Sequence, residues 1–294
     1  MNEQDFIKMF AKIHRLRPYE ADAERFGGML LSVDSFSKKE DFFENTPAKR
    51  IGKNMAAAAC ADLLACGASP QFLLQAWGID EAEDAKFYGE IAEGVEEVLA
   101  HYKAKCIGGD IGSSSPWTWT ATVGARSDFE PVGRIARSRE PFKLYATGAF
   151  GGANLAYFLG EPMPEFEPRR PVPQNALFAT DTSGGFFDAI ENFRRVNPGI
   201  SIKFGDIPMP SLPADFALPK ELLLIGGVGE YEIVYALPRG CKSSDICIAS
   251  GDFSGGEIEF KNGGIMRESP PDYRGIAPQE RFSKTMQYYA EVFK

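Results

Sequence analysis

Five acidic residues of this chain lie beside glycine, alanine or another small residue. Asp34 follows an apolar run, Asp62 lies inside ACADLLACGASP, and Asp110 ends CIGGD. Asp181 opens DTSGG, and Glu230 lies in GGVGEYEIVY. A carboxylate in apolar surroundings is costly unless a cation compensates it or it faces a cleft. Carboxylate oxygens are also preferred ligands of Mg²⁺, often together with substrate phosphates. The pattern therefore predicts a site where several segments converge on a divalent cation and a polyphosphate.

Glycines accompany these carboxylates at two predicted turns. The first turn lies directly before Asp110, and the second joins a strand to a helix over residues 148–152. Because glycine has no Cβ, backbone N–H groups at such turns can approach a phosphate closely. The pattern predicts that these positions contact the nucleotide. The glycines concerned are Gly108, Gly109, Gly148, Gly151 and Gly152.

Each of these motifs also has a purely structural interpretation. A Gly-Gly-Asp turn is commonly structural, and Asp34 can simply end a strand. Asp181 or Ser183 can cap the helix that follows, although the same helix start would also offer donors to an anion. Asp62 is the strongest functional candidate, because a helix of small apolar residues gives its carboxylate no partner.

The composition limits the class of protein. The chain has 294 residues, of which 44% are apolar and 25% charged, and its formal net charge is -9. This charge disfavours nucleic acid as a partner, and it would repel a polyphosphate unless Mg²⁺ screened the site. Five cysteines without a CxxC pair and only two histidines argue against a zinc site. The odd cysteine count and the lack of a signal-like N-terminus indicate a cytoplasmic location, and no apolar run is long enough to span a membrane.

Helical and strand periodicities alternate along the chain. Helices are predicted over 2–14, 46–66, 83–103 and 278–293, and strands over 27–33, 72–79, 118–125 and 143–148. Two further strands are predicted in LLLIGG and YEIVYAL, and the charged run 126–141 separates two sets of elements. We therefore expect mixed α/β or α+β layers in two domains, residues 1–137 and 138–294.

The order of the motifs is specific. LLSVDSFSKKEDF, GKNMAAAACADLLACGASP, CIGGDI, LYATGAFGGANLAYFL, DTSGGFFDAI and GGVGEYEIVYALP follow one another within residues 20–238. In this order they resemble the aminoimidazole-ribonucleotide-synthetase-like (PurM-like) superfamily, and within it the thiamine-monophosphate kinase family. The matches include Asp34 with Phe42 eight residues on, and Asp62 followed by Gly-Ala-x-Pro.

This resemblance implies a two-domain fold. The N-terminal domain would form a β-barrel shared between the subunits of a homodimer, and the C-terminal domain would be an α/β sandwich. ATP, as co-substrate, would lie between the domains with Mg²⁺, and its γ-phosphoryl group would pass to thiamine monophosphate, giving thiamine diphosphate and ADP. The implied metal ligands are Asp22, Asp34, Asp62, Asp110 and Asp181, and the implied catalytic residues are Asp181, Ser183 and Glu230.

The chain departs from the family pattern at positions that bear on the reaction. Gly184 replaces the aspartate of a Ser-Asp-Gly segment, and Asp41 replaces a substrate-loop histidine. Two alternatives therefore stand beside the kinase: another ATP-dependent enzyme of the superfamily with a different acceptor, and a nucleotide-binding protein that has lost turnover. Selenophosphate synthesis and hydrogenase maturation are disfavoured, because no cysteine precedes Cys60 and the chain ends EVFK.

Overall fold

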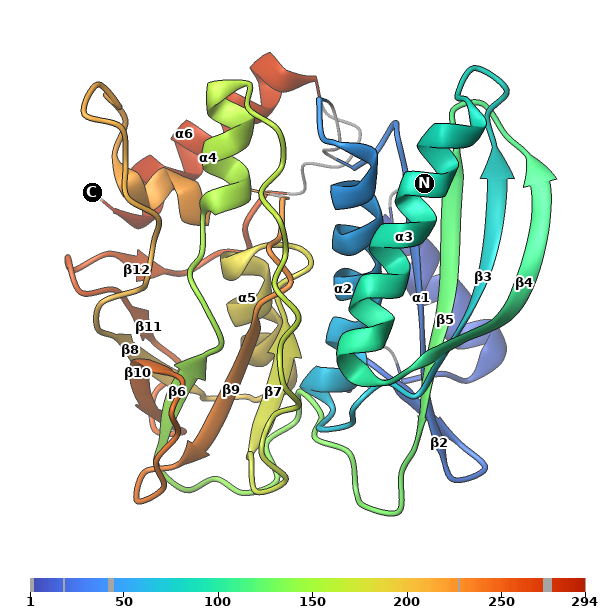
Figure 1. Cartoon of the computed structure of the whole chain (residues 1–294). Coiled ribbons are helices and arrows are strands. Elements are labelled where there is room, and N and C mark those ends of the chain that lie inside the picture. Colours follow the sequence, from blue (N-terminus) through green and yellow to red (C-terminus); the bar gives the residue numbers. More distant parts are fainter. Residues whose placement is uncertain (1–2, 18, 42–44, 227, 272–276, 294) are drawn as a thin grey trace.

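The computed structural model describes residues 3–17, 19–41, 45–226, 228–271 and 277–293, so Phe42 lies outside the described residues. Two sheets with their helices form two halves that lie side by side (Figure 1). One sheet has five strands in the order β1-β2-β5-β3-β4, and the other has seven in the order β12-β11-β8-β10-β6-β9-β7. The predicted mixed α/β fold with two sheet-based halves is confirmed.

The N-terminal half contains the five-stranded sheet. Its strands are β1 (Glu24–Phe26), β2 (Met29–Ser37), β3 (Phe72–Ile79), β4 (Lys105–Ser113) and β5 (Thr118–Arg126). Its helices are α1 (Glu3–His14), α2 (Ala48–Ala65) and α3 (Ala85–Tyr102). In β5 the buried side chains Trp119, Ala121 and Val123 alternate with threonines, as expected for a strand with one face on a core.

Helix α2 lies between the two sheets and is buried on nearly every side, because it packs against β2, β5 and α3 and also against β7 and β9. Its alanine-rich sequence allows these close approaches. At the crossing with α3, a Cβ on Gly52 would lie 2.0 Å from the carbonyl oxygen of Ile91. A Cβ on Gly94 would lie equally close to the carbonyl oxygen of Lys49, so both positions require glycine.

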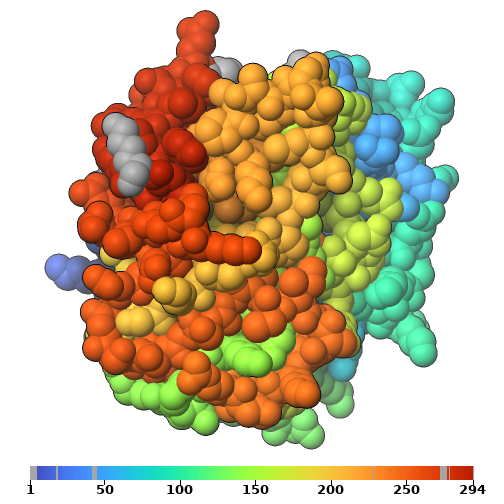
Figure 2. Space-filling view, turned by 90° about the vertical axis from the view of Figure 1, so that its left-hand side faces the viewer, coloured from blue at the N-terminus to red at the C-terminus, as the bar shows by residue number. Residues whose placement is uncertain are grey.

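The C-terminal half contains the seven-stranded sheet. Its strands are β6 (Phe142–Ala146), β7 (Phe178–Asp181), β8 (Ser201–Phe204), β9 (Ile233–Pro238), β10 (Ile246–Asp252), β11 (Ile258–Glu259) and β12 (Ile265–Met266). Its helices are α4 (Gly152–Leu159), α5 (Phe186–Val196) and α6 (Pro278–Val292), with a short 3-10 helix η1 (Lys220–Leu224). Residues of this half form most of the face seen in Figure 2. Its core is aromatic, with Phe178, Phe186, Phe187 and Phe193 fully buried.

Two local predictions were wrong or incomplete. LLLIGG was expected to form a strand, but Lys220–Leu224 forms η1, because these leucines pack beside α4 and α6 and not in a ladder. The strands β1, β7, β8 and β10 to β12 were not predicted, since their apolar runs are short or interrupted by glycine and serine. The boundary at residues 137 and 138 remains a prediction, within the connection 127–141 between the two sheets. Among the described residues, no helix has the length and apolar sequence needed to cross a lipid bilayer.

Candidate metal and phosphate site

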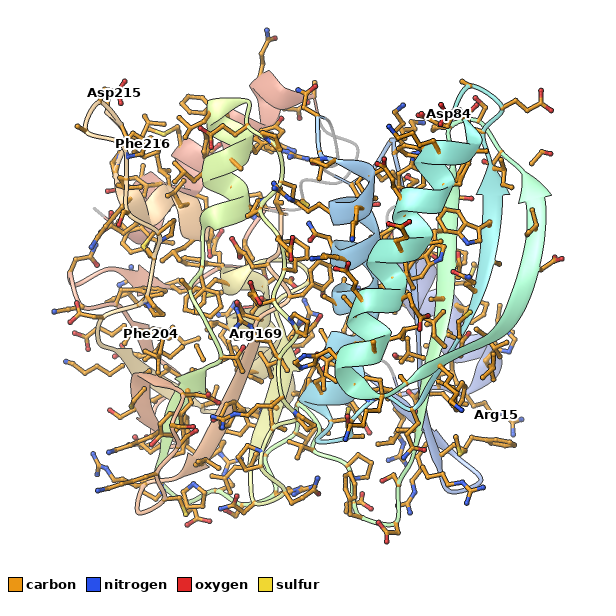
Figure 3. All side chains as sticks on the ribbon, in the orientation of Figure 1. Arg15, Asp84, Arg169, Phe204, Asp215 and Phe216 are labelled. Atoms are coloured by element: carbon orange, nitrogen blue, oxygen red, sulfur yellow. The ribbon has the colours of Figure 1, made fainter. Side chains whose placement is uncertain are left out.

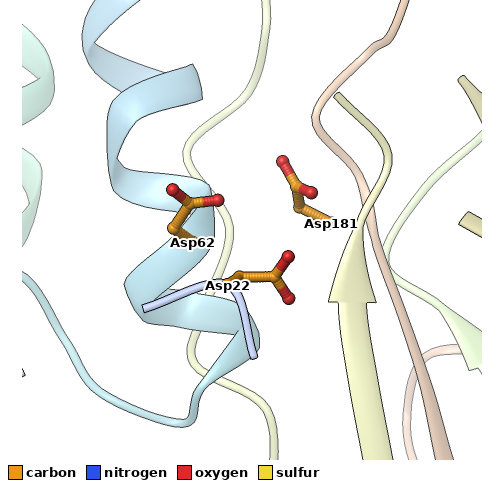
Figure 4. Close-up of side chains that lie close together, drawn as sticks. All are labelled: Asp22, Asp62 and Asp181. Carbon is orange, nitrogen blue, oxygen red and sulfur yellow. The ribbon is translucent and has the colours of Figure 1, made fainter. Parts of the chain in front are cut away.

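Three carboxylates from three different elements meet between the two halves. Asp22 lies in the loop between α1 and β1, Asp62 in α2, and Asp181 is the last residue of β7. One oxygen of each lies within 4.8 Å of the others, and Figure 4 shows the three carboxylates around a shared space between α2 and the end of β7. We call these three residues the carboxylate cluster. The alanines around Asp62 let α2 approach β7, and this contact brings the two halves of the site together.

Burial and mutual repulsion perturb all three groups. Burial, followed by the charge of Asp22, raises the pKa of Asp181 to about 8. Burial and the charges of Asp181 and Asp22 hold the pKa of Asp62 well above its usual range. Burial also raises the pKa of Asp22, although Arg134 opposes this shift. With all three carboxylates ionised, the site is therefore more stable with a cation bound than without one.

The donor set fits a hard divalent cation. The cluster offers only carboxylate oxygens, the ligand type that Mg²⁺ prefers, and it contains none of the cysteine or histidine ligands typical of zinc sites. Asp181 Oδ1 accepts a hydrogen bond from Ser183 Oγ at 3.2 Å, whereas Asp181 Oδ2 is buried and has no hydrogen-bond partner. A buried carboxylate oxygen without a partner is expensive, and a metal ion would satisfy it.

Asp34 lies near the cluster but is not part of it. It was predicted to follow a strand; instead it lies in the middle of β2, where it pairs with Ala121 of β5. The strand continues to Ser37 because β5 extends as far and pairs with it throughout. Asp34 Oδ1 accepts a hydrogen bond from the N–H of Ser35 at 2.8 Å, and its charge contributes to the raised pKa values of Asp62 and Asp181.

The segment containing Gly108, Gly109 and Asp110 is a strand and not the predicted turn. All three residues lie in β4, and Asp110 pairs with Ala76 of β3. A bulge at residues 107–108 accommodates Gly108 with φ of 133°, and a Cβ on Gly109 would lie 1.8 Å from the carbonyl oxygen of Gln75. Asp110 is exposed, and the fold of the single chain does not bring it to the carboxylate cluster.

The glycine turn before α4 already has an anionic partner. Glu230 Oε1 accepts hydrogen bonds from the N–H groups of Gly151 at 2.7 Å and Ala153 at 3.0 Å. This carboxylate therefore caps the N-terminus of α4, where Gly151 and Gly152 were predicted to contact a phosphate. Burial raises the pKa of Glu230 to about 7, and the two hydrogen bonds oppose the shift.

Gly148 adjoins a buried ion pair and not an open phosphate loop. A Cβ at this position would lie 2.3 Å from Glu232 Oε1, which forms an ion pair with Arg169. Thr147 Oγ1 donates to Glu232 Oε2 at 2.6 Å. In Figure 3 Arg169 lies at the junction of the two halves. Gly148 thus makes room for an ion pair within the C-terminal half.

The turn after Asp181 leads directly into α5. Ser183 is exposed, and Gly185 adopts φ of 89° at the helix N-cap. A Cβ on Gly184 would lie 2.5 Å from Asp188 Oδ2, so another carboxylate occupies the space beside this glycine. Sequence patterns did not single out Asp188, because an acidic residue in the first turn of a helix is common.

Two other residues at the site were not named as candidates from the sequence, although Tyr231 lies within the motif GGVGEYEIVY. Arg134 Nη2 forms an ion pair with Asp22 Oδ1, but Arg134 is one of several arginines in the run 126–141. Tyr231 adopts a left-handed backbone conformation with φ of 54°. Its ring centroid lies 6.1 Å from that of Phe36 and 5.3 Å from that of Phe166. Tyr231 therefore joins β2 to the C-terminal half beside the carboxylate cluster.

An open pocket of about 420 Å³ lies beside β2 and β5. Ser35 pairs with Thr120 and Ser37 with Thr118, so four hydroxyl groups lie together on one face of the two strands. Ser35 Oγ and Thr120 Oγ1 are 2.8 Å apart. The other lining residues are Phe36, Lys39, Glu40, Ser114 and Pro116. Such a lining suits a polar ligand.

Comparisons with known proteins support the resemblance inferred from the motifs. The family model described as AIR synthase related protein, N-terminal domain, matches residues 21–125. The chain is 29% identical to a thiamine-monophosphate kinase of Methanospirillum hungatei over 222 residues, which cover 71% of this chain and 75% of the relative. It is 26% identical to that of Archaeoglobus fulgidus over 249 residues, which cover 79% and 80%.

Solved structures show the same fold. The thiamine monophosphate kinase of Aquifex aeolicus superposes with a TM-score of 0.72 at 17% identity, covering 89% of this chain and 98% of that one. A complex of AaThiL with AMPPCP and TMP gives a TM-score of 0.76 at 16% identity, covering 93% and 97%. A HypE–HypF complex gives 0.68 at 18% identity, covering 90% and 99%. The fold of this chain is therefore the fold of these structures, as the resemblance implied.

Proposed function

We propose that the chain is a member of the AIR-synthase-related (PurM-like) superfamily and an ATP- and Mg²⁺-dependent phosphotransferase of the thiamine-monophosphate-kinase type. The observation that carries the proposal is the carboxylate cluster. Asp22 and Asp62 from one half meet Asp181 from the other, within 4.8 Å and largely out of water. A cluster of this kind suits a reaction that depends on positioning and on neutralising phosphate charge.

The residues of the cluster would hold Mg²⁺ through their carboxylate oxygens. When bound, this ion supplies the positive charge that offsets the charge on the transferred phosphoryl group. Asp181 precedes the turn that leads into α5, and the positive N-terminal end of this helix dipole favours an anion nearby. Ser183 Oγ donates to Asp181 Oδ1 and so orients that carboxylate.

We propose thiamine monophosphate as the acceptor, because the curated relatives named above are thiamine-monophosphate kinases. In this reaction the bond between the γ-phosphorus and its bridging oxygen breaks, and a bond to an oxygen of the acceptor phosphate forms. ADP leaves with the bridging oxygen. The hydroxyl-lined pocket beside β2 and β5 supplies donors and acceptors for a polar acceptor, and Phe36 connects it to Tyr231 beside the cluster.

A second candidate is a nucleotide-binding protein without turnover. Glu230 favours it, because this carboxylate fills the α4 N-terminus that a phosphate would otherwise occupy. The buried Asp181 Oδ2, which has no hydrogen-bond partner, supports a metal site and is compatible with both candidates.

An ADP-release assay separates these candidates. The full chain is incubated with Mg·ATP and one acceptor at a time: thiamine monophosphate, phosphorylated nucleosides or ribazole-like compounds. The proposal expects release with thiamine monophosphate and none in EDTA. Release only with another acceptor would keep the phosphotransferase and reject thiamine monophosphate. ATP binding without release for any acceptor would favour the second candidate.

We also propose that the chain forms a homodimer through its N-terminal half. All nine residues of the edge strand β4 are exposed, including Ile107 and Ile111. An uncovered edge strand with apolar side chains is a template for pairing with another chain. Val33 on β2 is also exposed. We propose separately that the domain boundary lies between residues 137 and 138 and that the protein is cytoplasmic.

A further inference from the structure

A tyrosine in the loop that carries Asp22 has a left-handed backbone conformation. Tyr19 adopts φ of 72°, which residues other than glycine rarely do. Arg15 and Lys103 also have positive φ, but they directly follow helices α1 and α3, where a left-handed residue is a common helix end. Tyr19 lies instead in the loop between α1 and β1. A strained conformation at such a place persists only when contacts with the surrounding structure hold it.

The end of helix α5 supplies one such contact. The guanidinium carbon of Arg195 lies 4.5 Å from the centroid of the Tyr19 ring, which is within the range of a cation–π interaction. Arg195 belongs to the last turn of α5 in the C-terminal half, whereas Tyr19 belongs to the N-terminal half. The stacked pair therefore joins the two halves just before Asp22 in the chain.

Hydrogen bonds along α5 hold the Arg195 side chain. Arg195 Nη1 donates to Asn192 Oδ1 at 3.2 Å, and Asn192 Nδ2 donates to Asp188 Oδ2 at 3.3 Å. These three residues recur at the spacing of one helix face. Asp188 in turn fills the space beside Gly184, in the turn between β7 and α5. One face of α5 thus connects the turn after β7 with the loop between α1 and β1.

A second set of contacts holds the same loop closer to Asp22. The N–H of Arg134 donates to the carbonyl oxygen of Glu20 at 2.8 Å, and the Arg134 guanidinium forms an ion pair with Asp22. A Cβ on Gly133 would lie 2.8 Å from the carbonyl oxygen of Glu20, so the two backbones are in close contact. These contacts fix the end of the loop, and the stacked pair adds a contact earlier in it.

We propose that Arg195 is a positioning residue of the carboxylate cluster: by stacking on Tyr19, it stabilises the backbone conformation that places Asp22 in the cluster. Rotation about φ of residue 19 changes the direction of the chain that leads to Asp22, so the carboxylate depends on this conformation for its place. The proposal rests on the metal site of the proposed function. It gives a role in that site to a helix face that contributes no carboxylate to the cluster.

The test compares metal binding in the full chain and in variants of the stacked pair. Arg195→Met removes the cation, Tyr19→Ala removes the ring, and a double variant removes both. Tyr19→Phe is the conservative variant, because it keeps the ring. Arg139→Met is the matched control, since Arg139 is also an exposed arginine and stacks on Phe253 at 4.8 Å within the C-terminal half.

Two quantities are measured for each protein. Free Mn²⁺ is followed by electron paramagnetic resonance during a titration, and its concentration at half saturation reports the affinity, whatever the number of ions bound. The Tm in EDTA reports the stability of the metal-free chain.

Arg195→Met should raise the half-saturating Mn²⁺ concentration by about two- to fivefold, the size expected for an exposed cation–π contact. Tyr19→Ala should raise it at least as much, and Tyr19→Phe should leave it near the wild-type value. In the double variant the increase should be no larger than in Tyr19→Ala, because both changes remove the same contact. Arg139→Met should change the Tm in EDTA to a similar extent but keep the wild-type affinity.

Unchanged Mn²⁺ affinity in Arg195→Met, or an equal loss in Arg139→Met, would overturn the proposal. Additive losses in the double variant would also overturn it. A loss in Tyr19→Phe as large as in Tyr19→Ala would place the effect in the hydroxyl group and reject the stacked pair.

The same titrations separate this inference from the proposed function. A wild type that binds no Mn²⁺ would reject both. A wild type that binds Mn²⁺ but transfers no phosphoryl group would reject the proposed function alone, since none of these measurements needs turnover.

Discussion

Replacing Asp181 by asparagine tests the electrostatics of the carboxylate cluster most sharply. At an effective dielectric constant of ~20, two ionised carboxylates at the 4.8 Å upper limit of this cluster would repel each other by about 3.5 kcal/mol. Burial and this repulsion raise the pKa of Asp181 from its ordinary 3.8 to about 8. The folded protein therefore binds this proton more tightly than the unfolded chain, and the free energy of unfolding falls as the pH rises between these two values.

At pH 7 this linkage lowers the free energy of unfolding of the metal-free protein by on the order of 4 kcal/mol. Asparagine cannot ionise, and its oxygen can still accept the hydrogen bond from Ser183 Oγ. Its amide nitrogen then replaces the buried Oδ2, which costs about 1–3 kcal/mol without a partner. We therefore expect Asp181→Asn to raise the free energy of unfolding in EDTA by about 2 kcal/mol, or several degrees in Tm.

The same variant should lose most of the stabilisation by Mg²⁺. At a Mg²⁺ concentration 100 times its dissociation constant, the wild type should gain about 2.7 kcal/mol. Differential scanning calorimetry in EDTA and in MgCl2 measures both effects. Asp215→Asn is the control, because Asp215 is exposed in a loop at the far side of the C-terminal half (Figure 3). A lower Tm in EDTA together with an undiminished Mg²⁺ shift would refute the reasoning and make Asp181 a structural residue.

Three further predictions follow from the fold. Asp110→Asn should keep the Mg²⁺-dependent Tm shift, because β4 holds Asp110 away from the cluster; loss of the shift would place Asp110 at the metal. Glu230→Gln should flatten the fall in the free energy of unfolding between pH 4.5 and about 7, since the folded Glu230 has a raised pKa; an unchanged slope in pH-dependent urea titrations would contradict this. Light scattering should give a dimer mass that Ile111→Lys reduces to a monomer mass, and a wild-type monomer would remove the proposed interface.

The sequence predicted the fold class because the order of its motifs is specific, and it named Asp22, Asp62 and Asp181 as ligands before the structure brought them together. The predictions that Asp34 follows a strand and that Asp110 lies at a turn were wrong, because both residues lie within strands. The ends of these strands depend on the partner strands β5 and β3. Local sequence does not contain that information.

The contacts that the sequence did not predict are long-range. Glu230 caps α4 through Gly151, 79 residues earlier in the chain, and Arg134 pairs with a carboxylate 112 residues away. Nothing in the run 126–141 distinguishes Arg134 from Arg137, which contacts only backbone carbonyls in the described structure. Partners at such distances are chosen by tertiary packing, and helical or strand periodicity carries no signal for them.

Transfer of a labelled γ-phosphoryl group is the most direct test of the central claim. The chain is incubated with Mg²⁺, γ-labelled ATP and thiamine monophosphate, and the label is followed into thiamine diphosphate by chromatography. The account predicts stoichiometric appearance of the label in this product, and a loss of at least tenfold in rate, about 1.4 kcal/mol, for Asp62→Asn. Label found only in free inorganic phosphate, or transfer at the wild-type rate in Asp62→Asn, would contradict it.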